Sequence, residues 1–281
     1  MLDPTARPDS DPGVPLPRIA IAAFTGWNDA GDASSGVIEH LREQWSAERV
    51  ATISAEDYSD LQVNRPQLLR DTDGVPRIEW PDTVIELLTP PGGAPVLVLS
   101  GPEPSFRWRA YCREVLDVLR ARGVSRLLTL GSLLADSPHS RPLPVARWDH
   151  SSQPDPDGSS YEGPIGMPTV LGHAAHDAGL EVTSLWGQVP HYVAQTPSPK
   201  AVLALVLAIQ DCFPTMIPLG DLELEAEAWQ RGVDELASSD PEIGDYVRRL
   251  EEAQDTVGLP GATGDAIAKE FERFLRRRRE D

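Results

Sequence analysis

Apolar residues recur along the chain in two periods, one typical of buried strands and the other typical of helices. Three mainly apolar segments have the length of a strand and end at glycine or polar residues; they cover 18–24, 95–101 and 124–130. Stripes at helical spacing cover about 32–46, 105–122 and 168–178. The alternation of strand and helix predicts a right-handed α/β unit with a largely parallel sheet.

Shorter segments complete this pattern. Further strands are expected at 50–54, 77–80, 83–88, 142–148 and 180–189, with a short helix around 65–70. The helix expected at 197–213 is apolar around most of its circumference, so it must be buried in the core or against another subunit. Residues 149–163 are rich in Asp, Ser, Pro and Gly and are read as a long loop.

Composition divides the chain into three parts. Residues 1–17 hold five prolines and three aspartates and are expected to be a disordered tail. Residues 18–218 form the expected α/β/α domain. Residues 219–281 are read as an acidic α-helical extension, because 221–255 hold 12 Asp or Glu against 3 Arg and the stripes are helical, with a last helix at about 263–279.

Charge and cysteine content narrow the class of protein. The 281-residue chain has a formal net charge of −19, so phosphate-rich nucleic acids and anionic membranes are poor partners. No apolar run reaches membrane-spanning length, and the first residues lack the apolar core of a signal peptide. Cys112 and Cys212 lie in apolar helical contexts and are read as buried, inert thiols. These features predict a cytoplasmic protein.

Familiar catalytic motifs are missing from the sequence. It holds no phosphate-binding loop, dinucleotide fingerprint, Gly-x-Ser-x-Gly elbow or His-Glu-x-x-His pair, and no cofactor is predicted. Polar residues instead follow three expected strands. The carboxyl ends of parallel strands share one edge of a sheet, where open α/β sheets bind their ligands, so these corners are the candidate site.

The first corner holds Trp27, Asn28, Asp29 and Asp32 between the first strand and the first helix. The two carboxylates and the amide suit a magnesium ion or a general base. The same residue types before a helix also satisfy its free N–H groups and complement its dipole. Capping is the simpler explanation.

The second and third corners bring His139 with Arg141, and His191 with Tyr192. His139 and Arg141 suit an anion or a partner's carboxylate, although a loop held together by hydrogen bonds to Arg141 explains them more simply. His191 beside Asp29 or Asp32 would make an acid/base pair; a structural histidine is the simpler alternative.

Two other groups have weaker functional readings. His173 and His176 lie three residues apart on a helix, but no third ligand stands at readable spacing, so no metal site is predicted. The run Arg276–Arg279 is surrounded by acidic residues. A solvated tail is its simplest reading, with the acidic 221–255 segment as the alternative contact.

Four motifs in this order resemble the proteasome assembly chaperone 2 family, in its actinobacterial branch. They are Gly26-Trp-Asn-Asp-Ala-Gly31, Pro138-His-Ser-Arg-Pro142, Tyr161-Glu-Gly-Pro-Ile-Gly166 and Pro190-His-Tyr-Val193. The resemblance implies a three-layer α/β/α sandwich, similar to phosphorylase/hydrolase-like sheet folds, with a C-terminal α-helical extension. It also implies a homo-oligomer, expected as a trimer, and a role in protein assembly with proteasome-related subunits.

Three functions remain open from the sequence. The first is a non-enzymatic chaperone-like or scaffolding protein that binds protein subunits through the candidate residues. The alternative is a hydrolase or phosphorylase-like enzyme with one pocket at the carboxyl edge of the sheet. In that enzyme Asp29 or Asp32 is the base or a metal ligand, His191 the acid/base partner, and His139 with Arg141 the anion clamp. The third is an oligomer that binds a small ligand without turning it over.

Overall fold

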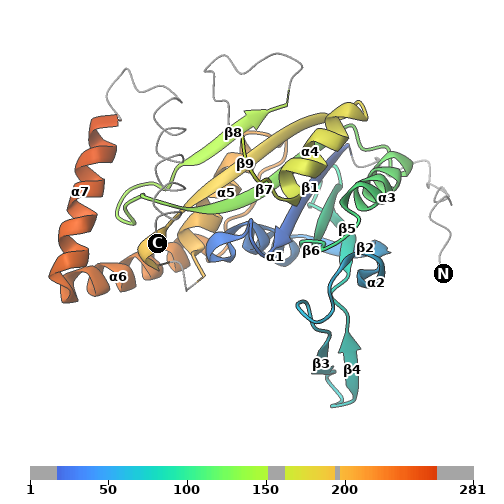
Figure 1. Ribbon diagram of the computed structural model, residues 1–281, viewed down its shortest axis with the longest axis horizontal. Helices are drawn as coiled ribbons and strands as arrows, with labels where there is room; N and C mark the ends of the chain where they lie inside the picture. Colours follow the sequence, from blue (N-terminus) through green and yellow to red (C-terminus); the bar gives the residue numbers. More distant parts are fainter. Residues whose placement is uncertain (1–17, 151–161, 194–196, 258–281) are drawn as a thin grey trace.

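A seven-stranded sheet with helices on both faces forms the body of the protein (Figure 1). The computed structural model describes residues 18–150, 162–193 and 197–257. The sheet has the order β2-β5-β6-β1-β7-β9-β8. Its strands are β1 Ile19–Thr25, β2 Ser46–Ile53, β5 Thr83–Thr89, β6 Val96–Pro102, β7 Arg126–Ala135, β8 Val145–Asp149 and β9 Glu181–Pro190.

The four central strands, β6, β1, β7 and β9, are parallel to one another. Next to them, β5 and β8 run antiparallel, and the edge strand β2 pairs antiparallel with β5. Residues of β1 alternate between the two faces, as a strand requires. Ile21 and Ala23 lie in the core on one face, whereas Ala20, Ala22 and Phe24 lie in the core on the other. Burial on both faces explains why this strand is an unbroken apolar run.

Two helical layers cover the sheet. One consists of α1 (Ala33–Gln44) and α5 (Pro199–Gln210), which belong to the first core. The other consists of α3 (Trp108–Ala121) and α4 (Met167–Asp177), with the single-turn α2 (Ala55–Tyr58) beside them. The predicted three-layer α/β/α sandwich is confirmed. The apolar helix expected at 197–213 is α5, which buries one face in the first core and leaves Leu207 50% exposed.

One predicted element is wrong. Residues 65–70 were expected to form a short helix, but Gln67–Arg70 is a strand, β3, paired antiparallel with β4 (Pro76–Glu79). Pro66 disfavours helical backbone at the preceding residue, and the turn around Gly74 brings Leu68 opposite Ile78. This hairpin projects from the body of the molecule (Figure 1).

The described part of the C-terminal extension is helical. It consists of α6 (Leu222–Ser239) and α7 (Pro241–Val257), which lie on the opposite side of the molecule from α3 (Figure 1). The N-terminal tail, most of the 149–163 loop, the expected helix at 263–279 and the run Arg276–Arg279 lie outside the described residues.

Candidate functional site

The first corner turns the chain from β1 into α1, and Asp29 caps that helix. One carboxylate oxygen of Asp29 accepts hydrogen bonds from the Ser34 N–H at 2.8 Å, the Ser34 hydroxyl at 2.7 Å and the Ser35 N–H at 3.1 Å. These are the free groups at the start of α1. Asp32 is exposed, has a left-handed backbone with φ 50°, and makes no side-chain cap. The capping interpretation therefore holds for Asp29 and is wrong for Asp32.

Asn28 connects this corner to two other elements. Its amide donates to Glu103 Oε1 at 2.6 Å, and the same oxygen accepts from the Met167 N–H at 2.7 Å, at the start of α4. A Cβ on Gly166 would lie 2.1 Å from Asn28 Oδ1, so only glycine fits there. We call Asn28, Glu103, Gly166 and Met167 the Asn28 joint. It fixes the loops after β1 and β6 against the start of α4.

The remaining groups of this corner differ sharply in exposure. Asn28 and Asp29 are buried, and Asn28 Oδ1 and Asp29 Oδ2 have no hydrogen-bond partner among the described residues. Trp27, in contrast, is 64% exposed. In this corner the Trp27 indole is therefore exposed to solvent, whereas the Asn28 amide and the Asp29 carboxylate are buried.

His139, from the second corner, is buried against the third corner and the extension. Its Nδ1 lies 2.7 Å from the Tyr192 hydroxyl, and its Nε2 lies 3.0 Å from Asp234 Oδ1 on α6. The His139 N–H also donates to the Tyr192 oxygen at 2.8 Å. Burial lowers the pKa of His139 below its usual 6.5, and the neighbouring Asp234 opposes that shift.

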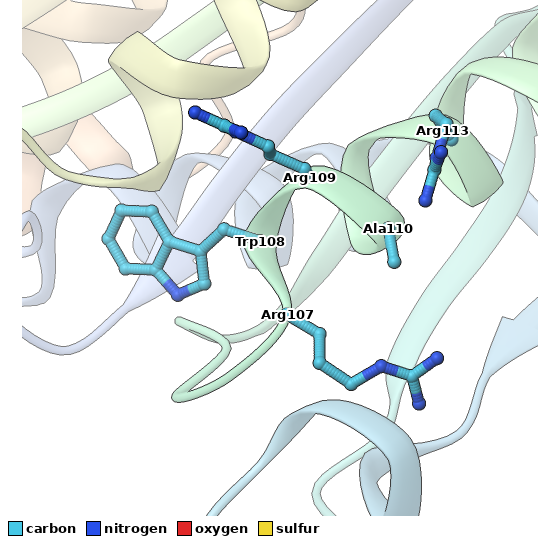
Figure 2. A pocket seen from close by; sticks show the side chains of 5 residues that line it. All are labelled: Arg107, Trp108, Arg109, Ala110 and Arg113. Carbon is cyan, nitrogen blue, oxygen red and sulfur yellow. The ribbon is translucent and has the colours of Figure 1, made fainter.

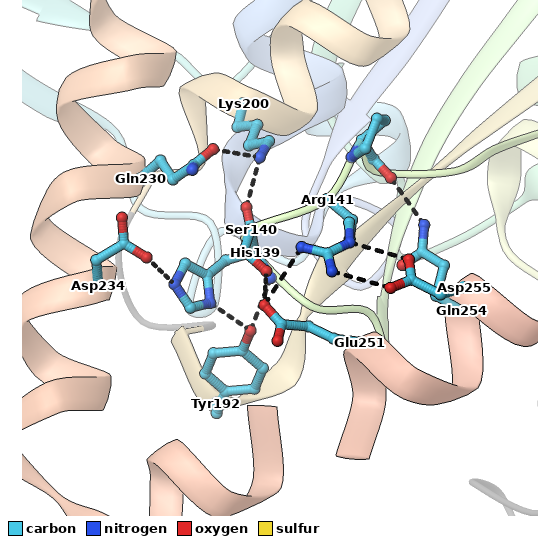
Figure 3. Close-up of polar contacts among 11 residues, drawn as sticks. His139, Ser140, Arg141, Tyr192, Lys200, Gln230, Asp234, Glu251, Gln254 and Asp255 are labelled. Atoms are coloured by element: carbon cyan, nitrogen blue, oxygen red, sulfur yellow. Dashed lines mark hydrogen bonds and ion pairs between the residues drawn. The ribbon is translucent and has the colours of Figure 1, made fainter. Parts of the chain in front are cut away.

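Arg141 binds carboxylates on α7 (Figure 3). Its guanidinium contacts both oxygens of Asp255, at 3.0 and 2.9 Å, and Glu251 Oε1 at 3.5 Å. The Ser140 hydroxyl donates to the same Glu251 oxygen. The hydrogen bonds that Arg141 donates to Asp255, together with the charge of Asp255, raise the pKa of Arg141, and the same contact lowers the pKa of Asp255. The sequence suggested an anion, a partner's carboxylate or a loop contact for Arg141; in the structure Arg141 binds carboxylates of the chain's own α7.

Lys200 and His191 extend these contacts. Lys200, at the start of α5, donates to the His139 carbonyl at 2.5 Å and to Gln230 of α6 at 2.6 Å. His191 Nδ1 lies 3.2 Å from Asp136 Oδ1, and that oxygen accepts from the Tyr246 hydroxyl at 2.8 Å. We call the polar contacts of His139, Arg141 and Lys200 with α6 and α7 the extension latch.

The first corner does not meet the other two in one pocket. Asp29 pairs with Ser132 of β7 in an isolated parallel bridge. Asp136, the partner of His191, comes four residues after Ser132, just beyond the end of β7. Strands rise about 3.3 Å per residue, so β7 and β9 carry their corner roughly 13 Å beyond Asp29. Among the described residues, no hydrogen bond or ion pair joins Asp29 or Asp32 to His191, which the enzymatic alternative requires.

Sequence reasoning missed the partners that hold these corners. Glu103, Lys200, Asp234 and the α7 carboxylates were not singled out. The acidic composition of 221–255 did signal a basic contact. The contacts seen in the described residues come from Arg141, Lys200 and His139, whereas Arg276–Arg279, the alternative contact named above, lies outside them.

Within the described ranges, no three His, Cys, Asp or Glu side chains are arranged to hold a metal ion. The helices of the described chain are too short or too polar to cross a membrane. Cys112 and Cys212 are both buried and unpaired, and burial raises the pKa of the Cys112 thiol to about 11.

The four motifs meet in pairs. Asn28, from the first motif, packs against Gly166 of the third, and His139 of the second bonds Tyr192 of the fourth. Fold and site together define an α/β/α sheet domain whose carboxyl edge is partly covered by its own acidic helical extension.

Comparisons with known proteins then place the chain in a family. The model of the PAC2 family matches residues 23–237, and the chain belongs to that family. A PAC2 family protein from Streptomyces avermitilis is 45% identical, with a TM-score of 0.72, over 82% of this chain and 99% of that one. A proteasome-assembly chaperone homologue from Mycobacterium tuberculosis is 40% identical, with a TM-score of 0.73 and the same coverage.

A more distant structure shares the fold alone. An archaeal proteasome activator from Pyrococcus furiosus is 15% identical, with a TM-score of 0.58, over 80% of this chain and 95% of that one. No match is found among curated protein sequences. The family resemblance expected from the four motifs is confirmed.

Proposed function

We propose that this protein is a non-enzymatic, chaperone-like or scaffolding protein that binds proteasome-related protein subunits. Membership of the PAC2 family is the observation that carries this proposal, because family members of known structure include a proteasome-assembly chaperone homologue. Fold alone would not carry it, since such sheets host many functions.

The state of the candidate residues supports a binding role over catalysis. Asp29 is used as a helix cap, and His139, Arg141 and Tyr192 are used to hold α6 and α7. A base or an anion clamp must instead be free to reach a substrate. Of the eight candidate residues, Trp27 offers the largest exposed apolar side chain, and we assign partner contact to it.

The protein is further proposed to act in the cytoplasm as a homo-oligomer of three copies. The family resemblance supports this assembly. Sedimentation equilibrium across a hundredfold range of protein concentration tests it; a single monomer mass at all concentrations contradicts it.

Binding to purified proteasome subunits tests the proposed function. The α-type and β-type subunits of an actinobacterium that encodes a close relative are titrated separately into the protein, and the heat of binding is recorded. Saturable binding of at least one subunit type is expected. Absence of binding to both types, alone and mixed, contradicts the proposal.

A further inference from the structure

A surface beside α3 differs from the rest of this acidic protein. Residues 103–113 hold three arginines, Arg107, Arg109 and Arg113, and one glutamate, whereas the chain as a whole carries a net charge of −19. The three arginines and Trp108 line a hollow of about 490 Å³ (Figure 2). This is a local positive surface on a strongly negative molecule.

Exposed apolar side chains lie on the neighbouring loops. Trp27 is 64% exposed, Phe106 is 52% exposed and Ile165 is 44% exposed. They belong to the three segments that the Asn28 joint ties together: the loop after β1, the loop after β6 and the approach to α4. Large apolar side chains beside arginines are the composition enriched at the centre of protein interfaces.

Two of the arginines have no partner within the described chain. Arg107 pairs with Asp57 at 3.0 Å and lies over the Tyr58 ring at 5.5 Å. The guanidinium groups of Arg109 and Arg113 are exposed and form no hydrogen bond or ion pair with the described residues. They are therefore available to another molecule.

The directions of these side chains decide the kind of ligand. Figure 2 shows Arg107, Arg109 and Arg113 extending from the start of α3 in different directions. A single phosphate requires donors that converge on one point. Arginines that diverge instead suit several carboxylates spread over an extended segment.

The loop that carries this surface is held rigidly. The backbone N–H groups of Ser105 and Phe106 both donate to the Tyr58 carbonyl, at 2.7 and 2.8 Å. The Trp108 indole N–H donates to the Pro104 carbonyl at 2.6 Å. A surface ordered before binding loses little conformational entropy when a partner arrives.

We propose that Trp27, Phe106, Arg109, Arg113 and Ile165 form a docking surface for an acidic segment of a partner protein that also carries apolar side chains. Charge complementarity identifies this occupant, and the extension latch shows the same recognition within the chain, with Arg141 holding carboxylates of a helix. The proposal rests on the proposed function, because the partner is then one of the subunits that the protein binds.

Two probes test the surface separately from the function. The first is the set of purified proteasome subunits described above. The second is a fluorescein-labelled peptide of five Glu-Leu repeats, with five Lys-Leu repeats as its charge control, followed by fluorescence anisotropy. Wild-type protein is expected to bind the Glu-Leu peptide and not the Lys-Leu peptide.

Matched variants locate the binding. The double variant Arg109→Gln/Arg113→Gln is expected to lose roughly tenfold in affinity for the subunit and the peptide. The control Arg49→Gln/Arg77→Gln removes the same charge from exposed arginines on β2 and β4 and is expected to bind as wild type. Neither pair of arginines is buried, so both variants are expected to fold.

The outcomes distinguish the two proposals. Subunit binding that is equal in wild type and Arg109→Gln/Arg113→Gln supports the function and overturns this surface. Peptide binding that depends on Arg109 and Arg113, without subunit binding, supports the surface and contradicts the function.

Three further outcomes would contradict the proposed docking surface. The first two indicate another occupant: arginine-dependent binding of a 20-base-pair DNA duplex, or loss of self-association in the double variant. The third is that neither probe binds to wild type.

Discussion

The carboxyl edge of the sheet has two halves that treat their polar corners differently. At the end of β7 and β9, basic and aromatic residues are covered by α6 and α7 and bind carboxylates of the same chain. At the end of β1 and β6, Asn28 belongs to the Asn28 joint and Asp29 caps α1. Trp27, Arg109 and Arg113 face solvent, and neither arginine pairs with a described residue. We call these the covered half and the open half.

This difference teaches that a polar corner at a sheet edge need not be a catalytic site. The covered half has the residue types of an anion clamp, yet its ligand is an acidic segment about 100 residues later in the chain. The open half has the residue types of a metal or base site, yet Asp29 forms a cap and Asn28 forms a joint, and only Asp32 is left exposed. What remains free on the open half is the composition of a protein interface.

The largest expected effect comes from breaking the covered half at His139. His139→Ala removes a buried ring and leaves Tyr192 and Asp234 without their partner, so the free energy of unfolding should fall by about 3 kcal/mol. Urea denaturation measures the change. His176→Ala, at a more exposed histidine paired with Asp177 at 3.8 Å, should change it by less than about 0.5 kcal/mol. Equal losses in the two variants would contradict the latch.

The next effect comes from breaking the joint of the open half. Gly166→Ala places a methyl group against the buried Asn28 side chain and should cost about 2 kcal/mol. Gly232→Ala, inside α6 with no atom within 4 Å of the added Cβ, should be neutral or stabilising. Urea denaturation of both variants decides, and a neutral Gly166→Ala would show that the joint is loose.

Acid should weaken the covered half through His139. Burial and the charge of Lys200 lower the pKa of His139 below 6.5 in the folded protein. Asp234 and Glu251 act in the opposite direction but do not outweigh them. The unfolded chain titrates near 6.5, so the contribution to stability is complete above that pH and is lost as pH falls through the lower folded pKa. The free energy of unfolding should therefore drop between pH 7.5 and 5.5.

A variant separates this effect from the other histidines. Burial and the neighbouring His173 and His176 lower the pKa of His150 to about 4, which gives a loss of the same sign. His150 is present in both wild type and His139→Gln, so it lowers the free energy of unfolding equally in the two proteins. The loss of unfolding free energy between pH 7.5 and 5.5 should therefore be smaller in His139→Gln, and the difference is the contribution of His139. An identical drop in both proteins would remove His139 as its source.

A smaller effect is expected at the exposed part of the latch. Arg141→Gln breaks its paired contacts with Asp255, and α7 should then exchange its amide hydrogens faster than in wild type. Because both groups reach solvent, the difference should shrink in 0.5 M NaCl. An acceleration that persists in high salt would contradict an electrostatic latch.

The smallest effect on stability is expected at Trp27. Trp27→Ser alters an exposed side chain and should change the free energy of unfolding by less than about 0.5 kcal/mol, while subunit binding weakens. Leu236→Ser, at a side chain 45% exposed on α6, is the control and should leave binding unchanged. Equal binding by both variants would argue against Trp27 as a contact.

The fold was readable from the sequence because its central strands are buried on both faces. Mainly apolar segments such as 18–24 and 95–101 have few alternatives to a parallel sheet. The strand β4 was expected at 77–80, but β3 was predicted as a helix. This hairpin lies outside the core, and Leu68 and Ile78 are both exposed, so the alternation that marks a half-buried strand is absent.

For the candidate site, the sequence predicted only which polar residues follow the ends of strands. The sequence pattern placed Asp29 and His139 after the ends of strands. The distance between those ends depends on how many residues β7 extends past the end of β1, and the sequence does not give that number. The choice of Asp234 and Asp255 as partners depends on how α6 and α7 pack, which local sequence does not specify.

Hydrogen–deuterium exchange with and without a bound proteasome subunit tests the central claim most directly. The account predicts that binding slows exchange in residues 103–113 and 162–166, on the open half, and leaves α6 and α7 unchanged. Slower exchange confined to residues 137–142, α6 and α7 would contradict it, because the partner would then bind the covered half.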